Sequence, residues 1–194
     1  MDSGEIKVSS RDAVELLERI MGSYHAYYAR AALDRLPTSI GLVYYIHNMP
    51  AGTAVCYTAV GSMKLGVIYY VAVDHKFRGR GIGKALVSSC ERALDMPEAY
   101  VATIELRNHP SARMFQQLGY TVKAYSELAR EVGWKAISAI HHATCSYEED
   151  LIALKPASPK AVEKLPSMTP DDYKEVWWEI CYKPWMERKY RALV

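Results

Sequence analysis

The stretch that joins a buried strand to a helix constrains the fold of this chain most. Leu65 to Val73 is nearly all apolar, which is typical of a strand buried on both faces. Gly79, Gly81 and Gly83 follow at alternate positions, and an amphipathic helix is expected from Lys84 to Leu94. Glycine adopts positive φ and has no Cβ, so backbone N–H groups can converge on a ligand. Because a helix N-terminus adds unpaired donors and partial positive charge, the junction predicts a pyrophosphate site.

The spacing of these glycines excludes two other phosphate motifs. A P-loop needs its first glycine one residue further upstream than Gly79, and a Ser or Thr where Ala85 stands. A dinucleotide fingerprint reads G-x-G-x-x-G, whereas the spacing here is G-x-G-x-G. Four cations flank or separate the glycines: Lys76, Arg78, Arg80 and Lys84.

Hydrophobic periodicity predicts an α/β (α+β) fold with a central mixed, mostly antiparallel sheet flanked by helices. Alternating patterns predict strands at residues 5–8, 42–46, 53–60, 65–73, 100–106, 120–125 and 151–154. Helical spacing predicts helices at residues 9–22, 27–36, 84–94, 110–118 and 128–143. The strands up to Val73 form an antiparallel meander, and the strand–helix–strand order that follows makes part of the sheet parallel.

The domain organisation follows from a change in composition near residue 156. Residues 1–155 form the main domain, and residues 156–169 have linker composition. Thr169-Pro170-Asp171-Asp172 then opens a helix. Because this helix carries an apolar face with three tryptophans, we expect 156–194 to be a C-terminal helical extension. It packs on the domain or on a partner subunit, which would make a homodimer.

Composition excludes several classes of protein. The net charge is +2 with both signs interspersed, so we expect neither a nucleic-acid nor a membrane partner. The start of the chain lacks the pattern of a secretory signal and no apolar run could span a bilayer, so a soluble, cytoplasmic protein is expected. Two Asn, two Gln and fifteen Tyr hint at a thermophilic source.

The cysteines and histidines predict no metal site. The four cysteines lie far apart with no C-x-x-C pair, so buried free thiols are expected, although a thermophilic source makes a disulfide less improbable. His141 and His142 are adjacent and therefore do not share a helix face.

Two motifs in the right order resemble the GNAT acetyltransferases, and are closest to their RimI-like, peptide-acetylating members. Arg78-x-x-Gly81-x-Gly83 matches the [Q/R]-x-x-G-x-[G/A] loop of that family. Downstream, the N-x(6)-[Y/F]-x(3)-G-[F/Y] pattern is matched by Asn108, Phe115, Gly119 and Tyr120. The resemblance covers roughly residues 5–155, firmly over 65–122.

The resemblance implies a sheet that is splayed just past Val71-Ala72-Val73, where backbone groups bind the pantetheine arm of acetyl-CoA. It implies that the loop N–H groups hold the pyrophosphate and that Asn108 contacts the cofactor near the pantetheine. The implied cofactor-binding residues are Val71, Ala72, Val73, Arg78, Gly79, Arg80, Gly81, Ile82, Gly83, Lys84 and Asn108. The implied reaction moves an acetyl group to a primary amine by direct attack in a ternary complex.

The implied chemistry needs a base for the ammonium proton and an acid near the leaving thiolate. We expect Glu105, on the strand 100–106, to be the base, although a solvated surface acid is the alternative reading. Phe115 stands where many relatives have an acid Tyr. Water could supply that proton, or a neighbouring hydroxyl could: Tyr120, Tyr125 or Tyr147.

The acceptor stays open among a peptide N-terminus, a lysine side chain and a small amine. Seven tyrosines fall in segments that line the acceptor side in this family: Tyr24, Tyr27, Tyr28, Tyr44, Tyr45, Tyr69 and Tyr70. They suggest an aromatic pocket. Two other readings remain, an acyl-CoA-binding sensor that has lost catalysis, which Phe115 favours, and an unrelated phosphate- or nucleic-acid-binding module.

Overall fold

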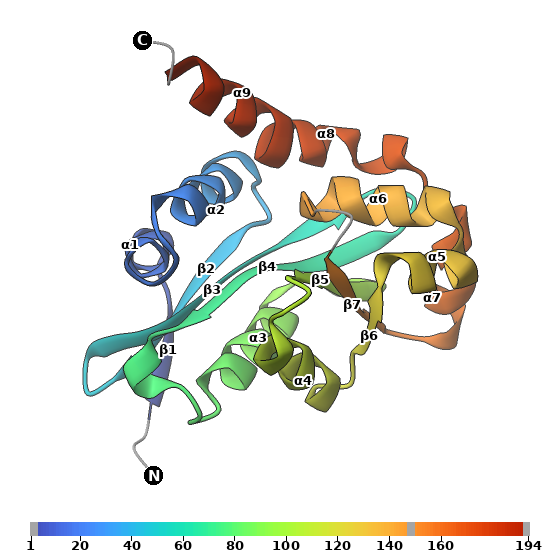
Figure 1. Cartoon of the computed structure of the whole chain (residues 1–194). Coiled ribbons are helices and arrows are strands. Elements are labelled where there is room, and N and C mark those ends of the chain that lie inside the picture. Colours follow the sequence, from blue (N-terminus) through green and yellow to red (C-terminus); the bar gives the residue numbers. More distant parts are fainter. Residues whose placement is uncertain (1–3, 147–149, 192–194) are drawn as a thin grey trace.

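A seven-stranded sheet forms the centre of the molecule, with strand order β1-β2-β3-β4-β5-β7-β6 (Figure 1). The computed structural model describes residues 4–146 and 150–191. The strands are β1 (Gly4–Val8), β2 (Ile40–Ile46), β3 (Met49–Val60), β4 (Lys64–Val73), β5 (Ala99–Ile104), β6 (Thr121–Ala124) and β7 (Leu151–Pro156). The predicted fold class is confirmed: strands β1 to β4 form an antiparallel meander, and β4 and β5 are parallel.

Helices cover both faces of the sheet. On one face lie α1 (Ser10–Met21), α2 (Ser23–Arg35), α5 (Tyr125–Val132) and α6 (Trp134–Thr144). On the other lie α3 (Ile82–Ala93) and α4 (His109–Gln117). Alternate residues of β3 divide between the two cores, since Cys56 faces α3 whereas Tyr57 faces α6, as the period of two in a strand requires.

Local sequence signals explain where several helices begin and end. The Ser9 side chain caps α1 by accepting a hydrogen bond from the Asp12 N–H at 3.2 Å. The Asp12 carboxylate accepts from the Tyr45 hydroxyl at 2.7 Å. Instead of the single helix predicted at 128–143, the chain forms α5 and α6, because it breaks at Gly133, where φ is +85°. Glycine adopts this conformation without the steric cost that a Cβ would bring.

After β7, the chain returns along the face that α6 covers. The stretch 156–169, with linker composition, contains α7 (Pro159–Lys164), whose N-cap is Ser158. The buried Tyr173 hydroxyl donates to the Met63 carbonyl at 2.6 Å and fixes this part of the chain to the β3–β4 turn.

A long helical segment then crosses above α6 and α2 (Figure 1). It consists of α8 (Lys174–Trp177), a π-helical turn (Trp178–Tyr182) and α9 (Lys183–Arg191). We call residues 174–191 the C-terminal segment. Within the described residues, every helix is too short or too polar to cross a membrane.

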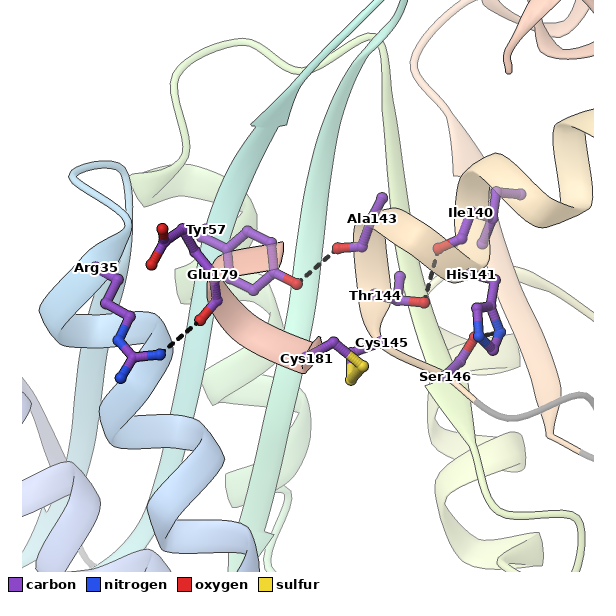
Figure 2. The surroundings of a disulfide bond; sticks show 10 residues. All are labelled: Arg35, Tyr57, Ile140, His141, Ala143, Thr144, Cys145, Ser146, Glu179 and Cys181. Atoms are coloured by element: carbon purple, nitrogen blue, oxygen red, sulfur yellow. Dashed lines mark hydrogen bonds between the residues drawn. A yellow bond between two sulfur atoms is a disulfide. The ribbon is translucent and has the colours of Figure 1, made fainter. Parts of the chain in front are cut away.

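A disulfide joins Cys145, at the end of α6, to Cys181 in the C-terminal segment, with the two Cα atoms 5.4 Å apart (Figure 2). The expectation of four free thiols is therefore wrong for this pair and right for Cys56 and Cys90, which are free and buried. The fold brings together two cysteines that are 36 residues apart in sequence.

Candidate active site

The sheet opens between β4 and β5. These strands pair in parallel at only three positions, Leu65 with Ala99, Gly66 with Tyr100, and Val67 with Val101. Beyond them β4 continues to Val73 and β5 to Ile104, each paired only with its other neighbour. Backbone groups of β4 on this side therefore have no partner strand, and an extended ligand could take that place.

The glycine loop lies at the wide end of this opening. Gly79 and Gly81 have φ of +77° and +80°, and no atom lies within 4 Å of the place of a Cβ at either residue. Gly81 is the N-cap of α3, and no side chain occupies the cap. No side-chain hydrogen bond from the N-cap therefore satisfies the first N–H groups of this 12-residue helix, which suits an anion such as a pyrophosphate.

Gly83 contributes to helix packing and does not supply the positive φ expected of the loop glycines. Its φ is not positive, and a Cβ there would lie 2.8 Å from the Met114 sulfur. The glycine therefore lets α3 approach α4 closely. Helix α3 begins at Ile82, two residues before the expected start at Lys84.

The four cations around the loop are all exposed: Lys76, Arg78, Arg80 and Lys84. The Nε of Arg78 donates to the Val73 carbonyl at 3.1 Å, which fixes the loop to the end of β4. The Arg80 guanidinium lies 5.6 Å from the Phe77 ring centre. The loop is therefore surrounded by positive charge that can attract a phosphate.

A cavity of about 630 Å³ extends from the opening between β4 and β5 toward the C-terminal segment. Its walls come from β4, β5, α2, α4, the end of α6 and the C-terminal segment. Of the residues singled out from sequence, Val71, Glu105, Asn108 and Phe115 line this cavity. Ala72, Val73 and the loop residues 78–84 lie outside its lining, along the strand and at the helix start.

Glu105 lies directly after β5, not on it, because the strand ends at Ile104. Its side chain is exposed, and it lines the cavity. The carbonyl of Glu105 accepts a hydrogen bond from the Asn108 N–H at 2.8 Å, so a tight turn places both residues at one edge of the opening.

Asn108 is the N-cap of α4, and its Oδ1 accepts from the Ser111 N–H at 3.2 Å. The side-chain NH2 group of Asn108 is then the part that can serve a ligand. This residue therefore also fixes where α4 begins.

Phe115 is buried and packs edge-to-face on Tyr120, with ring centres 5.0 Å apart. Neither Tyr120 nor Tyr125, expected as substitute acids, lines the cavity. Burial raises the pKa of Tyr120, and the Tyr125 hydroxyl donates to the Ile137 carbonyl at 3.4 Å beneath α6. Tyr147 lies outside the described residues.

Four of the seven tyrosines expected around the acceptor do line the cavity: Tyr24, Tyr28, Tyr69 and Tyr70. Tyr27, Tyr44 and Tyr45 do not. Burial raises the pKa of Tyr69 and lowers that of His25, which also lies on the wall. A neutral His25 imidazole and a protonated Tyr69 phenol therefore line this side at neutral pH.

Sequence reasoning missed the contribution of the C-terminal segment to this cavity. Trp177, Cys181, Tyr182 and Trp185 all line it. The aromatic face was visible in the sequence, but nothing in the sequence placed it over the opening between β4 and β5.

Within residues 4–146 and 150–191, no group of three or more His, Cys, Asp or Glu side chains is arranged to hold a metal ion. The His142 ring, one of the adjacent pair, instead hydrogen-bonds the Pro170 carbonyl at 2.9 Å.

Residues 11–120 match the model of the Acetyltransferase (GNAT) family. That match covers more than half of the 194 residues. The chain therefore belongs to this family, and it is an acyltransferase of the N-acetyltransferase type whose donor is acetyl-CoA. None of the curated proteins compared with the chain matches it.

Solved structures share the fold at low sequence identity. The GNAT family N-acetyltransferase YhbS of Escherichia coli, in complex with CoA, is 16% identical with a TM-score of 0.55, over 84% of this chain and 86% of that one. The PaiA N-acetyltransferase of Thermoplasma acidophilum, in complex with coenzyme A, is 11% identical with a TM-score of 0.55, over 79% and 99%. The ribosomal-protein-S18-alanine N-acetyltransferase of Escherichia coli is 15% identical with a TM-score of 0.53, over 80% and 95%.

Proposed function

We propose that this enzyme transfers the acetyl group of acetyl-CoA to a primary amine by direct attack in a ternary complex. One observation carries the proposal: the opening between β4 and β5 leads from an open, cationic helix N-terminus to a cavity with a carboxylate, Glu105, at its edge. A donor laid along β4 would have its pyrophosphate at the loop and its thioester at the cavity.

In this proposal, the residues around the opening bind acetyl-CoA. Backbone groups of Val71, Ala72 and Val73 would pair with the pantetheine arm, and the Asn108 amide would contact it from the other side. The N–H groups of Gly79 to Lys84, with the side chains of Arg78 and Arg80 nearby, would hold the pyrophosphate. Open space at Gly79 and Gly81 supports this assignment.

In the proposed reaction, Glu105 takes a proton from the ammonium group, directly or through a water, and so frees the amine lone pair. The nitrogen forms the new C–N bond as the C–S bond breaks, the electron pair leaves with the sulfur, and the second proton on the nitrogen passes to water to give the neutral amide. A thiol has an ordinary pKa near 8.5, so the thiolate leaves readily and then takes a proton from water or a cavity hydroxyl. Phe115 cannot supply that proton.

Two measurements test the proposal. We expect calorimetry to give micromolar CoA binding, on the order of −8 kcal/mol. Glu105→Gln should lower kcat/KM by about 10²-fold at pH 7, and by less at high pH, where the amine is already neutral. The matched control is Glu163→Gln, on the exposed surface of α7, which should leave the rate unchanged. No CoA binding at millimolar concentration contradicts the function, and a wild-type rate for Glu105→Gln from pH 6 to 9 contradicts the role of Glu105.

A second candidate function, an acyl-CoA sensor, is favoured by Phe115, which puts a buried ring where an acid hydroxyl would serve. It predicts CoA binding without release of free CoA in the presence of any amine.

Three further expectations stay predictions: a cytoplasmic location, a thermophilic source and a homodimer through the C-terminal segment. Trp178 and Tyr190 are about half exposed on that segment, so they are the residues that a second copy could cover. Sedimentation of the full chain, with Trp178→Ala for comparison, tests the dimer.

A further inference from the structure

The C-terminal segment presents an aromatic face to the cavity. Trp177 and Tyr182 are stacked, with ring centres 5.1 Å apart and planes at 26°. They are five residues apart, and the π-helical turn Trp178–Tyr182 brings residues at this spacing onto one side. Trp185 continues the row at 5.8 Å from Tyr182. The cavity therefore has a wall of nearly parallel rings on this side.

Other elements add rings to the cavity lining. On α2, which packs against the C-terminal segment, the rings of Tyr24 and Tyr28 lie 5.1 Å apart. On β4, the rings of Tyr69 and Tyr70 lie 4.5 Å apart. The cavity is thus lined by aromatic rings from three elements, and its carboxylates are Asp150 and Glu105, the latter beside the end of β5.

Bonds on two sides fix the C-terminal segment over the cavity. On one side, the Cys145–Cys181 disulfide ties it to α6, and both cysteines line the cavity. On the other, the Arg35 guanidinium of α2 donates to the Glu179 carbonyl at 3.1 Å, as Figure 2 shows. The same guanidinium reaches both carboxylate oxygens of Glu187 at 2.8 and 2.9 Å.

Two further contacts strengthen the attachment to α2. The Tyr27 hydroxyl donates to Glu187 at 2.8 Å, and the Arg188 guanidinium lies 4.8 Å from the Tyr24 ring centre. The Arg35–Glu187 pair is charge-assisted, with one guanidinium nitrogen donating to both carboxylate oxygens, and such hydrogen bonds are stronger than neutral ones. The aromatic wall therefore cannot swing aside without breaking a covalent bond or this ion-pair cluster.

We propose that Trp177, Tyr182 and Trp185 determine acceptor specificity, and that they select a small primary amine with a flat, apolar aryl body over a peptide. This inference rests on the proposed acetyl transfer. A flat apolar group would be buried against these ring faces, and its ammonium group would be attracted by the rings and by Glu105. A peptide brings backbone N–H and C=O groups that need partners, and rings offer few. A volume of about 630 Å³ for donor arm and acceptor together is in the range of small-molecule sites.

The test compares two acceptors, 2-phenylethylamine and an alanine tetrapeptide amide, on wild-type enzyme, Trp185→Ala and the control Trp134→Ala. Trp134 is an exposed tryptophan at the start of α6 and lies outside the cavity lining. We expect kcat/KM to be at least about tenfold higher for 2-phenylethylamine than for the peptide. Trp185→Ala should raise KM for 2-phenylethylamine about tenfold, with kcat and the KM for acetyl-CoA nearly constant, whereas Trp134→Ala should change none of these.

A binding measurement keeps the inference separate from the proposed function. With CoA present, 2-phenylethylamine should quench tryptophan emission in Trp134→Ala as in wild type, whereas quenching in Trp185→Ala should require about tenfold more amine. A preference for the peptide, or equal values for both variants, overturns the inference while acetyl transfer stands. CoA binding without transfer to either acceptor, and without quenching, overturns the inference too. Failure to bind CoA removes the proposed function itself.

Discussion

Removal of the Cys145–Cys181 disulfide should both lower the stability of the enzyme and weaken its binding of the amine acceptor. The bond closes a loop of 36 residues. For such a loop, the entropy that a cross-link removes from the unfolded chain amounts to about 4 kcal/mol at 25 °C. Because domains of this kind have a free energy of unfolding of roughly 5 to 15 kcal/mol, the loss is a large share of the total. The melting temperature should fall by roughly 8 to 15 °C.

The perturbation is the double variant Cys145→Ser/Cys181→Ser, with untreated and reduced wild-type enzyme beside it. Calorimetric scans give the melting temperatures, and urea titrations give the free energy of unfolding. Reduced wild type should match the double variant, and the double variant should not respond to reductant, because Cys56 and Cys90 are already free. Steady-state kinetics should show a higher KM for the amine and an unchanged KM for acetyl-CoA.

Two results would refute this reasoning. Equal stability of wild type with and without reductant would mean that the bond does not form in solution. A large stability loss with unchanged acceptor kinetics would mean that the ion-pair cluster at Glu187 alone holds the aromatic wall.

Three further predictions concern single residues. Gly81→Val and Gly83→Val should each weaken CoA binding more than 100-fold by calorimetry, while circular dichroism stays native. Gly81→Val forces a positive φ on a branched residue, and Gly83→Val puts a side chain against Met114 between α3 and α4. Normal binding by both variants would mean that the loop is misassigned. Phe115→Tyr should keep or raise kcat, because it adds a hydroxyl where the leaving thiolate needs a proton. A loss of kcat with native stability would contradict a role for a hydroxyl at this position. The hydrogen bond from Arg35 lowers the pKa of Glu187 below its ordinary 4.5. The ion pair therefore stabilises the fold fully above pH 4.5, and this stabilisation is lost as the pH falls through the lowered pKa. Arg35→Met should therefore lower the melting temperature more at pH 7 than at pH 3, and an equal loss at both would contradict the ion-pair role.

The sequence was sufficient for the parts of the fold that local signals specify. The apolar run before the glycines predicted β4, and the glycines predicted the start of α3 to within two residues. Gly119, with φ of +85°, directly follows Leu118, the C-cap of α4. These features depend on propensity and on backbone geometry over a few residues, so they can be recognised without the rest of the chain.

The missed features depend on contacts between distant segments. Nothing local to Cys145 or Cys181 pairs them, because the return of the chain after β7 brings them together. The C-terminal face was recognised as a packing surface, but its place over the cavity follows from the β3–β4 turn that holds Tyr173. The two hydroxyls considered as substitute acids also depend on distant contacts, since Tyr120 and Tyr125 pack into cores away from the cavity.

The short pairing between β4 and β5 has a consequence for amide hydrogen exchange. Only Leu65 to Val67 of β4 are joined to β5, so the N–H groups from Ile68 to Val73 that face the gap have no strand to protect them. Their deuterium uptake should resemble that of an edge strand, although β4 lies in the middle of the sheet. A donor bound along this gap would act as the missing strand, and protection gained there on adding CoA would map the path of its pantetheine arm residue by residue.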